Sequence, residues 1–229
     1  MIDWGNIDTV FLDMDGTLLD LHFDNHFWLE HVPVRYAGRH GLVIEDARRI
    51  LEKKYRAISG TLNWYCIDYW SDALELDVAE LKREVEHLIA IRPGVETFLQ
   101  ALKASDKRTL LVTNAHKKSL TLKMENTGLE RYFDGLVCSH DLGLPKEDPK
   151  FWDRIAEVEP YNRSRTLLID DSQSVLTSAR EAGIGYLLSI AQPDSRQPVT
   201  KAGEFEAVDD FQKLLPIEKA VVEPGVKRG

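Results

Sequence analysis

The stretch Val10-Phe11-Leu12-Asp13-Met14-Asp15-Gly16-Thr17 decides how the rest of this chain is interpreted. Three apolar residues run directly into two carboxylates that are separated by one residue and followed by a glycine. Because alternate residues of a strand point to the same side, Asp13 and Asp15 are expected to converge at the end of a buried strand. Their like charges repel unless a cation lies between them, and carboxylate oxygens are ligands that suit Mg²⁺. The stretch therefore predicts a strand that ends at a magnesium site.

Apolar runs that alternate with amphipathic segments predict the core of the fold. Besides residues 10–13, strand-like runs lie at 109–113, 135–139, 166–170 and 185–190. Helical patterns lie at 95–104, 116–127, 149–158 and 172–182, and Gly128 and Gly183 are placed to end two of these helices. Strands that are apolar on both faces and alternate with helices indicate an α/β fold with a parallel sheet flanked by helices. Active sites of such sheets lie beyond the carboxyl ends of the strands.

The segment from about Leu19 to Ile91 breaks this alternation. It is helical in pattern, rich in aromatic residues and without a convincing strand, and the turn residues Arg92-Pro93-Gly94 follow it. We therefore expect residues 20–91 to form an inserted, all-helical cap domain. Residues 1–19 and 92–229 would form the core domain, whose charged tail 216–229, with its Pro and Gly, is expected to be loosely ordered.

The net charge of −9 argues against several classes of function. A nucleic-acid groove and an anionic membrane surface both need clustered Lys and Arg, so neither partner is expected. A small anionic substrate stays compatible, because a local site can be positive on an acidic protein. No signal peptide or membrane-spanning run is visible, which favours the cytoplasm, where Cys66 and Cys138 are expected to be buried free thiols. The sequence contains no heptad seam from which an oligomeric state could be inferred.

Polar residues follow the predicted strands in a recognisable order. The series begins with Asp13 and Asp15 and continues with Thr113-Asn114, then Lys146 within Gly143–Pro149, and finally Asp170-Asp171-Ser172. Each motif lies at a predicted strand end or helix start. In this order the four motifs resemble those of the haloacid dehalogenase-like (HAD) hydrolase superfamily, and the resemblance covers the whole core. It implies a Rossmann-like core domain with an inserted cap.

The resemblance also implies a division of labour among the acidic residues. A carboxylate can attack phosphorus and form an acyl-phosphate, and the resemblance assigns this role to Asp13. Asp15 would act as general acid and base, protonating the leaving oxygen and later deprotonating the attacking water. Mg²⁺ would be held by the Asp13 side chain, the Asp15 backbone carbonyl and Asp171, with Asp170 as a ligand through water or an orienting partner.

The remaining motif residues are expected to bind the phosphate. Thr113 would donate from its hydroxyl and Asn114 mainly from its backbone N–H, while Lys146 would pair with both the phosphate and Asp13. The acid at position 15 also distinguishes the phosphatases of the superfamily from its dehalogenases. A leaving alkoxide needs a proton from such an acid, whereas a halide leaves without one. The resemblance therefore favours phosphomonoester hydrolysis, or a phosphomutase, over dehalogenation.

Candidate substrate contacts in the cap come from Asn63-Trp64-Tyr65 and from Asp24-Asn25. A ring of Trp64 or Tyr65 would stack on a planar base, which is worth roughly 1–3 kcal/mol; alternatively, these rings form the core of the cap. Asp24, Asn25 and Asn63 would hydrogen-bond a base edge or ribose, unless Asp24 and Asn25 cap a helix. His116 starts a predicted helix and is the histidine that could approach the phosphate.

Segments of the cap and core narrow the resemblance further. Leu18–Leu21, Phe23–Trp28, Leu62–Ser71, Leu99–Ser105, Thr113–His116 and Pro145–Asp148 resemble the bacterial GMP/IMP nucleotidase group of the HAD hydrolases. This implies hydrolysis of purine nucleoside 5′-monophosphates, although nothing in the sequence separates GMP from IMP or AMP. The alternatives are a sugar-phosphate phosphatase or phosphomutase with the same core, and a non-catalytic binding module on this scaffold. A binding module predicts loss of motif residues, and none is lost.

Overall fold

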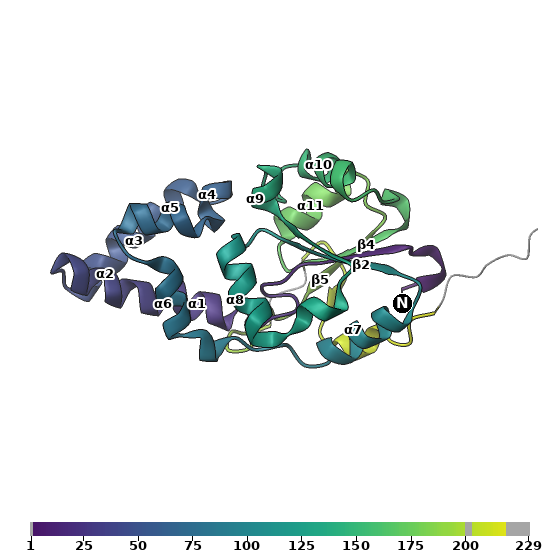
Figure 1. Ribbon diagram of the computed structural model, residues 1–229, viewed down its shortest axis with the longest axis horizontal. Helices are drawn as coiled ribbons and strands as arrows, with labels where there is room; N and C mark the ends of the chain where they lie inside the picture. The colour runs from purple at the N-terminus through teal and green to yellow at the C-terminus, as the bar shows by residue number, and fades with distance from the viewer. Residues whose placement is uncertain (1, 200–202, 219–229) are drawn as a thin grey trace, which may run out of the picture.

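The computed structural model describes residues 2–199 and 203–218, and within them six strands form one parallel sheet (Figure 1). The strand order is β3-β2-β1-β4-β5-β6, so β1 lies inside the sheet between β2 and β4. The strands are β1 Thr9–Leu12, β2 Arg108–Thr113, β3 Gly135–Cys138, β4 Thr166–Ile169, β5 Tyr186–Ile190 and β6 Ala207–Val208. The predicted parallel sheet is thus confirmed, with the first five strands close to their expected positions.

The register of the sheet brings the ends of its central strands together. Leu12, the last residue of β1, pairs with Leu111 of β2 and with Ile169, the last residue of β4. The amide of Asp13 then donates to the carbonyl of Ile169 (3.0 Å). Because all these strands run in the same direction, the polar residues that follow β1, β2 and β4 lie at one edge of the sheet.

Helices cover both faces of the sheet, as the apolar strands predict. Val10 and Leu12 pack with α7 Val95–Ala104 and α8 Lys117–Thr127 on one face. Phe11 points to the opposite face and packs with α10 Phe151–Val158 and α11 Gln173–Glu181, while the short α9 Ser139–Leu142 follows β3. This alternation along β1 follows from the two-residue period of a strand. It leaves Thr9–Leu12 wholly buried.

The helical insert, residues 20–91, carries helices and no strand, and every residue of it is described. Its helices are α1 His22–His26, a π-helix Phe27–His31, α2 Val32–His40, α3 Ile44–Ile58, α4 Leu62–Tyr65, α5 Ile67–Leu74, α6 Val78–Glu84 and a 3-10 helix Glu86–Leu88. Phe23, Phe27 and Trp70 lie in a hydrophobic core that belongs to the insert itself. Figure 1 shows these helices gathered at one end of the molecule, beside the sheet. The exact domain boundaries and the action of the insert as a cap stay predictions.

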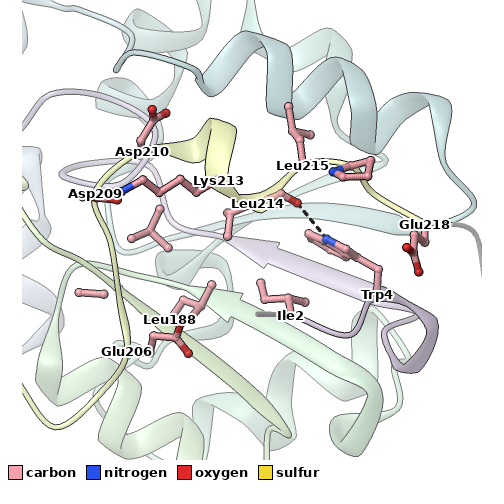
Figure 2. Close-up of a pocket in the computed structure, with 13 residues that line it drawn as sticks. Ile2, Trp4, Leu188, Glu206, Asp209, Asp210, Lys213, Leu214, Leu215 and Glu218 are labelled. Carbon is pink, nitrogen blue, oxygen red and sulfur yellow. Dashed lines mark hydrogen bonds and ion pairs between the residues drawn. The ribbon is translucent and has the colours of Figure 1, made fainter.

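The C-terminal part of the described chain adds a strand that the sequence analysis did not predict. β6 has two residues and pairs in parallel with β5, and a strand of that length leaves no periodic pattern. Beyond it, the indole N–H of Trp4 donates to the carbonyl of Leu214 (3.0 Å), beside a cavity of about 210 Å³ (Figure 2). Of the expected loose tail 216–229, residues 219–229 lie outside the described residues.

Two further expectations concern the membrane and the cysteines. In residues 2–199 and 203–218, no helix combines the length and the apolar character needed to cross a bilayer. Cys66 and Cys138 are both free, as expected. Cys138 is buried but Cys66 is partly exposed, so the prediction of burial is correct for Cys138 only.

Two glycines offer a matched test of the packing. A Cβ on Gly185, just before β5, would lie 2.5 Å from the backbone carbonyl oxygen of Ser164, whereas a Cβ on the helical, exposed Gly38 would meet nothing within 4 Å. We expect Gly185→Ala to lower the free energy of unfolding by about 1–3 kcal/mol. Gly38→Ala should raise it by roughly 0.5–1 kcal/mol. Urea denaturation measures both, and equal stabilities would contradict the packing at Gly185.

Candidate active site

Lys146 is the centre of the predicted phosphate-binding group. Its side chain is fully buried, and its ammonium donates to Asp13 (2.5 Å), to Asp170 (2.6 Å) and to the carbonyl of Val112 (3.0 Å). Burial works against the charge, but the two carboxylates outweigh it and raise the pKa of Lys146. A cation is therefore fixed between the ends of β1, β2 and β4, where the sequence analysis placed it.

The carboxylates of Asp13, Asp170 and Asp171 form a cluster that fits a divalent cation. One oxygen from each lies within 4.8 Å of the others. Asp170 also accepts from the amide of Ser172 (2.9 Å), so both its oxygens are engaged. Asp171, by contrast, accepts no hydrogen bond from any described residue, and burial together with the charge of Asp13 raises its pKa well above the usual range. Three carboxylates lie close together and only two of them bind the Lys146 ammonium, which leaves negative charge for a cation to neutralise.

The backbone conformation at position 16 and the space around it explain why a glycine follows the two acids of the first motif. Its φ is +82°, in the left-handed region, and a Cβ there would lie 2.4 Å from Oδ2 of Asp171. Any side chain at this position would displace the carboxylate that is free to bind a metal. The absence of a side chain at Gly16 therefore allows the first and fourth motifs to lie close together.

Thr113 is the last residue of β2 and Asn114 follows it, and both line the same cavity as this cluster. The Thr113 hydroxyl oxygen accepts from the amide of Ala115 (3.0 Å). The Asn114 side chain accepts from the amide of Lys146 (2.9 Å) and donates to Glu147 (2.9 Å). Asn114 thus holds the loop that carries Lys146, and the contact of its backbone N–H with the phosphate stays a prediction.

Asp15 is held by a lysine that the sequence analysis missed. Lys123 of α8 is buried and donates to Asp15 (2.6 Å) and to Asp24 of α1 (2.6 Å). Burial raises the pKa of Asp15 to about 6, with Lys123 opposing the shift. A sequence signal did exist, because Lys123 lies three residues after Leu120 and four after Ser119, on the buried face of its helix.

Asp24 lines a cavity described below and is bound by two buried lysines. It caps no helix, since its carboxylate accepts from Lys123 and from Lys82 of α6 (2.8 Å). These two ammonium groups outweigh the effect of burial and lower the pKa of Asp24 to about 2. The carboxylate therefore fixes two cations at the boundary between insert and core, and its contact with substrate stays a prediction.

The other predicted contacts of the insert fall into two groups. Trp64 and Tyr65 line a cavity described below, and the ring of Trp64 packs edge-on against Tyr55 and Trp70, so it belongs to the cavity wall and to the aromatic packing of the insert. Asn25 also lines that cavity but donates to Asp194 (2.7 Å). Asn63 is exposed and lines neither cavity of the site, so its predicted contact with substrate is not supported.

Two adjoining cavities make up the site. The acidic cavity, of about 190 Å³, is lined by the residues of all four motifs, including Asp13, Thr113, Lys146 and Asp171. The aromatic cavity, of about 340 Å³, lies between insert and core and is lined by several rings, those of Trp28, Tyr55, Trp64 and Tyr65. Four residues line both cavities: Asp15, Leu21, Tyr65 and Ala115. The cavity beside Trp4 (Figure 2) shares no lining residue with either.

His116 and Tyr65 show how the insert meets the core at this boundary. The Tyr65 hydroxyl donates to Glu147 (2.5 Å), next to Lys146 in sequence. His116 lines the aromatic cavity and not the acidic one, and its Nδ1 accepts from the amide of Lys118 at the start of α8. The histidine singled out for a possible approach to the phosphate thus lies on the aromatic side.

The fold and this cluster define a class of hydrolase. The family described as haloacid dehalogenase-like hydrolase matches residues 7–183, and the chain belongs to it. Over 215 residues the chain is 41% identical to the GMP/IMP nucleotidase YrfG of Escherichia coli strain K12, covering 94% of this chain and 97% of that protein. It is 25% identical to a phosphoglycolate phosphatase of Pseudomonas fluorescens strain Pf0-1, covering 90% and 78%. The structure of a HAD phosphatase from Thermococcus onnurineus matches with a TM-score of 0.74 at 21% identity, covering 91% and 96%.

Asp24 allows the buried ion pairs to be tested. Asp24→Asn would leave Lys82 without its carboxylate and Lys123 with Asp15 as partner. We expect the free energy of unfolding to fall by about 3–5 kcal/mol, because an uncompensated buried charge is costly. Asp46→Asn, which removes an exposed pair with Arg49, should change it by less than about 1 kcal/mol. Urea denaturation compares the two, and similar small losses would contradict the role given to Asp24.

Proposed function

We propose that the protein is a Mg²⁺-dependent phosphomonoester hydrolase that acts on purine nucleoside 5′-monophosphates through an aspartyl-phosphate on Asp13. The observation that carries the proposal is the junction of the two cavities at Asp15. A substrate whose phosphate occupies the acidic cavity would extend its leaving group past Asp15 into the aromatic cavity. The 41% identity to a GMP/IMP nucleotidase along nearly the whole chain supports a nucleoside as that leaving group.

The acidic cavity supplies each group that phosphoryl transfer needs. Lys146, the Thr113 hydroxyl and the backbone N–H of Asn114 would hold the phosphate oxygens and offset their charge. A bond forms between the Asp13 carboxylate and phosphorus while the bond from phosphorus to the 5′-oxygen breaks. Asp15 gives its proton to that oxygen, which leaves as the nucleoside hydroxyl. Water then attacks the acyl-phosphate, Asp15 takes a proton from it, and inorganic phosphate leaves.

Two carboxylates and a backbone carbonyl would hold the metal ion that this chemistry uses. Asp13 and Asp171, with the backbone carbonyl of Asp15, would hold Mg²⁺, and Asp170 would orient the site from its bond to Lys146. When bound, Mg²⁺ screens the repulsion between Asp13 and the phosphate and stabilises charge on the transferred group. The unpaired carboxylate of Asp171 is the feature of these residues that best fits this role.

The aromatic cavity fits a planar, partly polar leaving group better than a small sugar. Its volume falls within the range of small-molecule sites. Rings such as Trp28 and Trp64 offer faces on which a base can stack, and stacking accepts any base. A sugar phosphate would leave most of this aromatic surface without a partner.

The alternative of a phosphomutase is tested by the release of inorganic phosphate. A hydrolase releases it, whereas a phosphomutase keeps the phosphate in its product.

A panel of phosphomonoesters tests the substrate class. We expect purine 5′-monophosphates to give a kcat/KM at least about tenfold above that of glucose 6-phosphate or glycerol 3-phosphate, because base stacking is worth roughly 1–3 kcal/mol. Phosphate release in the presence of Mg²⁺ is the measurement. A flat profile, or a preference for sugar phosphates, would refute the nucleotide proposal and leave the hydrolase family unaffected.

Replacing the proposed nucleophile tests the mechanism. Asp13→Asn keeps the size of the side chain but removes the attacking oxygen, so turnover should fall by at least about 10³-fold on every substrate. Chelation by EDTA should abolish wild-type turnover, and added Mg²⁺ should restore it. Asp46→Asn serves as the control with unchanged activity, and circular dichroism checks the fold. Appreciable turnover by Asp13→Asn would rule out the covalent route.

A further inference from the structure

Lys82 of α6 is a buried cation in the wall of the aromatic cavity. Its side chain is 4% exposed, and its ammonium donates to Asp24 at 2.8 Å. Asp24 is shared, because its other oxygen accepts from Lys123. Lys123 has Asp15 as a second carboxylate partner, whereas Lys82 has no second acceptor among the described residues. Of the two lysines, Lys82 is therefore the one whose charge is less fully paired.

The donors of Lys82 are not all used. An ammonium carries three N–H donors, and one of them is directed to Asp24. Around the ammonium lie the ring of Phe27 (4.6 Å to the centroid), that of Phe23 (4.9 Å) and that of Trp28 (5.7 Å). Ring faces attract a cation but are weak substitutes for a hydrogen-bond acceptor. A ligand in the cavity that offers an oxygen or nitrogen lone pair would gain a charge-assisted hydrogen bond here.

Trp28 and Lys82 lie together in the wall of the aromatic cavity. The Trp28 ring lines the aromatic cavity and also lies beside Lys82. Asp15 lines the same cavity and also the acidic cavity, where the phosphate is proposed to bind. A nucleotide anchored by its phosphate near Asp15 would have its base among the rings and an edge of that base near Lys82.

We propose that Lys82 selects purines that carry a carbonyl at C6 by donating to O6, or to O6 and N7, of the base. Guanine and hypoxanthine both present acceptors at these two atoms, whereas adenine presents an amino group at C6. An amino donor facing a buried ammonium gains no hydrogen bond and meets a like partial charge. The inference rests on the proposed nucleotidase function and assigns its base specificity to one residue outside the motifs.

The test compares three substrates on three proteins. The substrates are IMP, AMP and purine riboside 5′-monophosphate, which has hydrogen at C6. The proteins are the wild type, Lys82→Met, which keeps the length of the side chain, and Arg83→Met, which removes the neighbouring, exposed cation that does not line the aromatic cavity. The quantity measured is the ratio of kcat/KM between IMP and each of the other two.

We expect wild type and Arg83→Met to favour IMP by about 10- to 100-fold over both other substrates. In Lys82→Met both ratios should fall to within about threefold of one, chiefly by loss of activity on IMP. Lys82→Arg, which retains a cationic donor, should keep part of the preference. Because each ratio is taken on one protein, a smaller folded fraction of a variant does not change it.

The outcomes that overturn the inference differ from those that overturn the proposed function. Lys82→Met with the wild-type ratios would show that another group selects the base. A wild type that hydrolyses IMP and purine riboside 5′-monophosphate equally would refute the inference without any variant, although the protein would remain a nucleotidase. A wild type that prefers sugar phosphates would refute the nucleotidase proposal itself.

Discussion

The buried ammonium of Lys146 is the interaction on which the site depends. It lies between the carboxylates of Asp13 and Asp170, at the ends of two neighbouring parallel strands, and it also bonds the carbonyl of Val112 in a third. Without it, the parallel register would bring buried acids together with no compensating charge, which a low-dielectric interior does not tolerate. One ammonium does not balance the cluster, since Asp171 is still free. The residual negative charge is what makes the cluster suitable for Mg²⁺.

A second buried network extends this arrangement into the helical insert. Lys123 joins Asp15 of the core to Asp24 of α1, and Asp24 in turn binds Lys82 of α6. The proposed acid-base residue is thus connected, through three hydrogen bonds, to the residues that surround the aromatic cavity. In this arrangement the insert completes the electrostatic surroundings of Asp15 and forms one wall of the space in which a leaving group would lie.

The sequence predicted the parallel sheet well because the sheet depends on local patterns, whereas the four motifs were found through their resemblance to those of the HAD hydrolases. Apolar runs of strand length followed by Asp or Thr indicate strand ends, and β1, β2 and β4 all end as expected. It did not predict Lys123, since a single lysine on an apolar helix face resembles a surface residue until its partners are known. The partners of Asp24 were not predicted for the same reason: Lys82 and Lys123 lie 58 and 99 residues away.

The amino-acid sequence by itself determined the fold class, because the alternation of strands and helices follows from periodicity. It also determined the order of the four motifs, whose resemblance to those of the HAD hydrolases indicated the family. The tertiary structure alone decided which charges meet. The strand register put Asp13 beside Asp170, and the loop between α9 and α10 put Lys146 between them. The docking of the insert put two lysines on Asp24 and joined the two cavities at Asp15. Such pairings depend on distances in space between residues far apart in the chain, which no local pattern encodes.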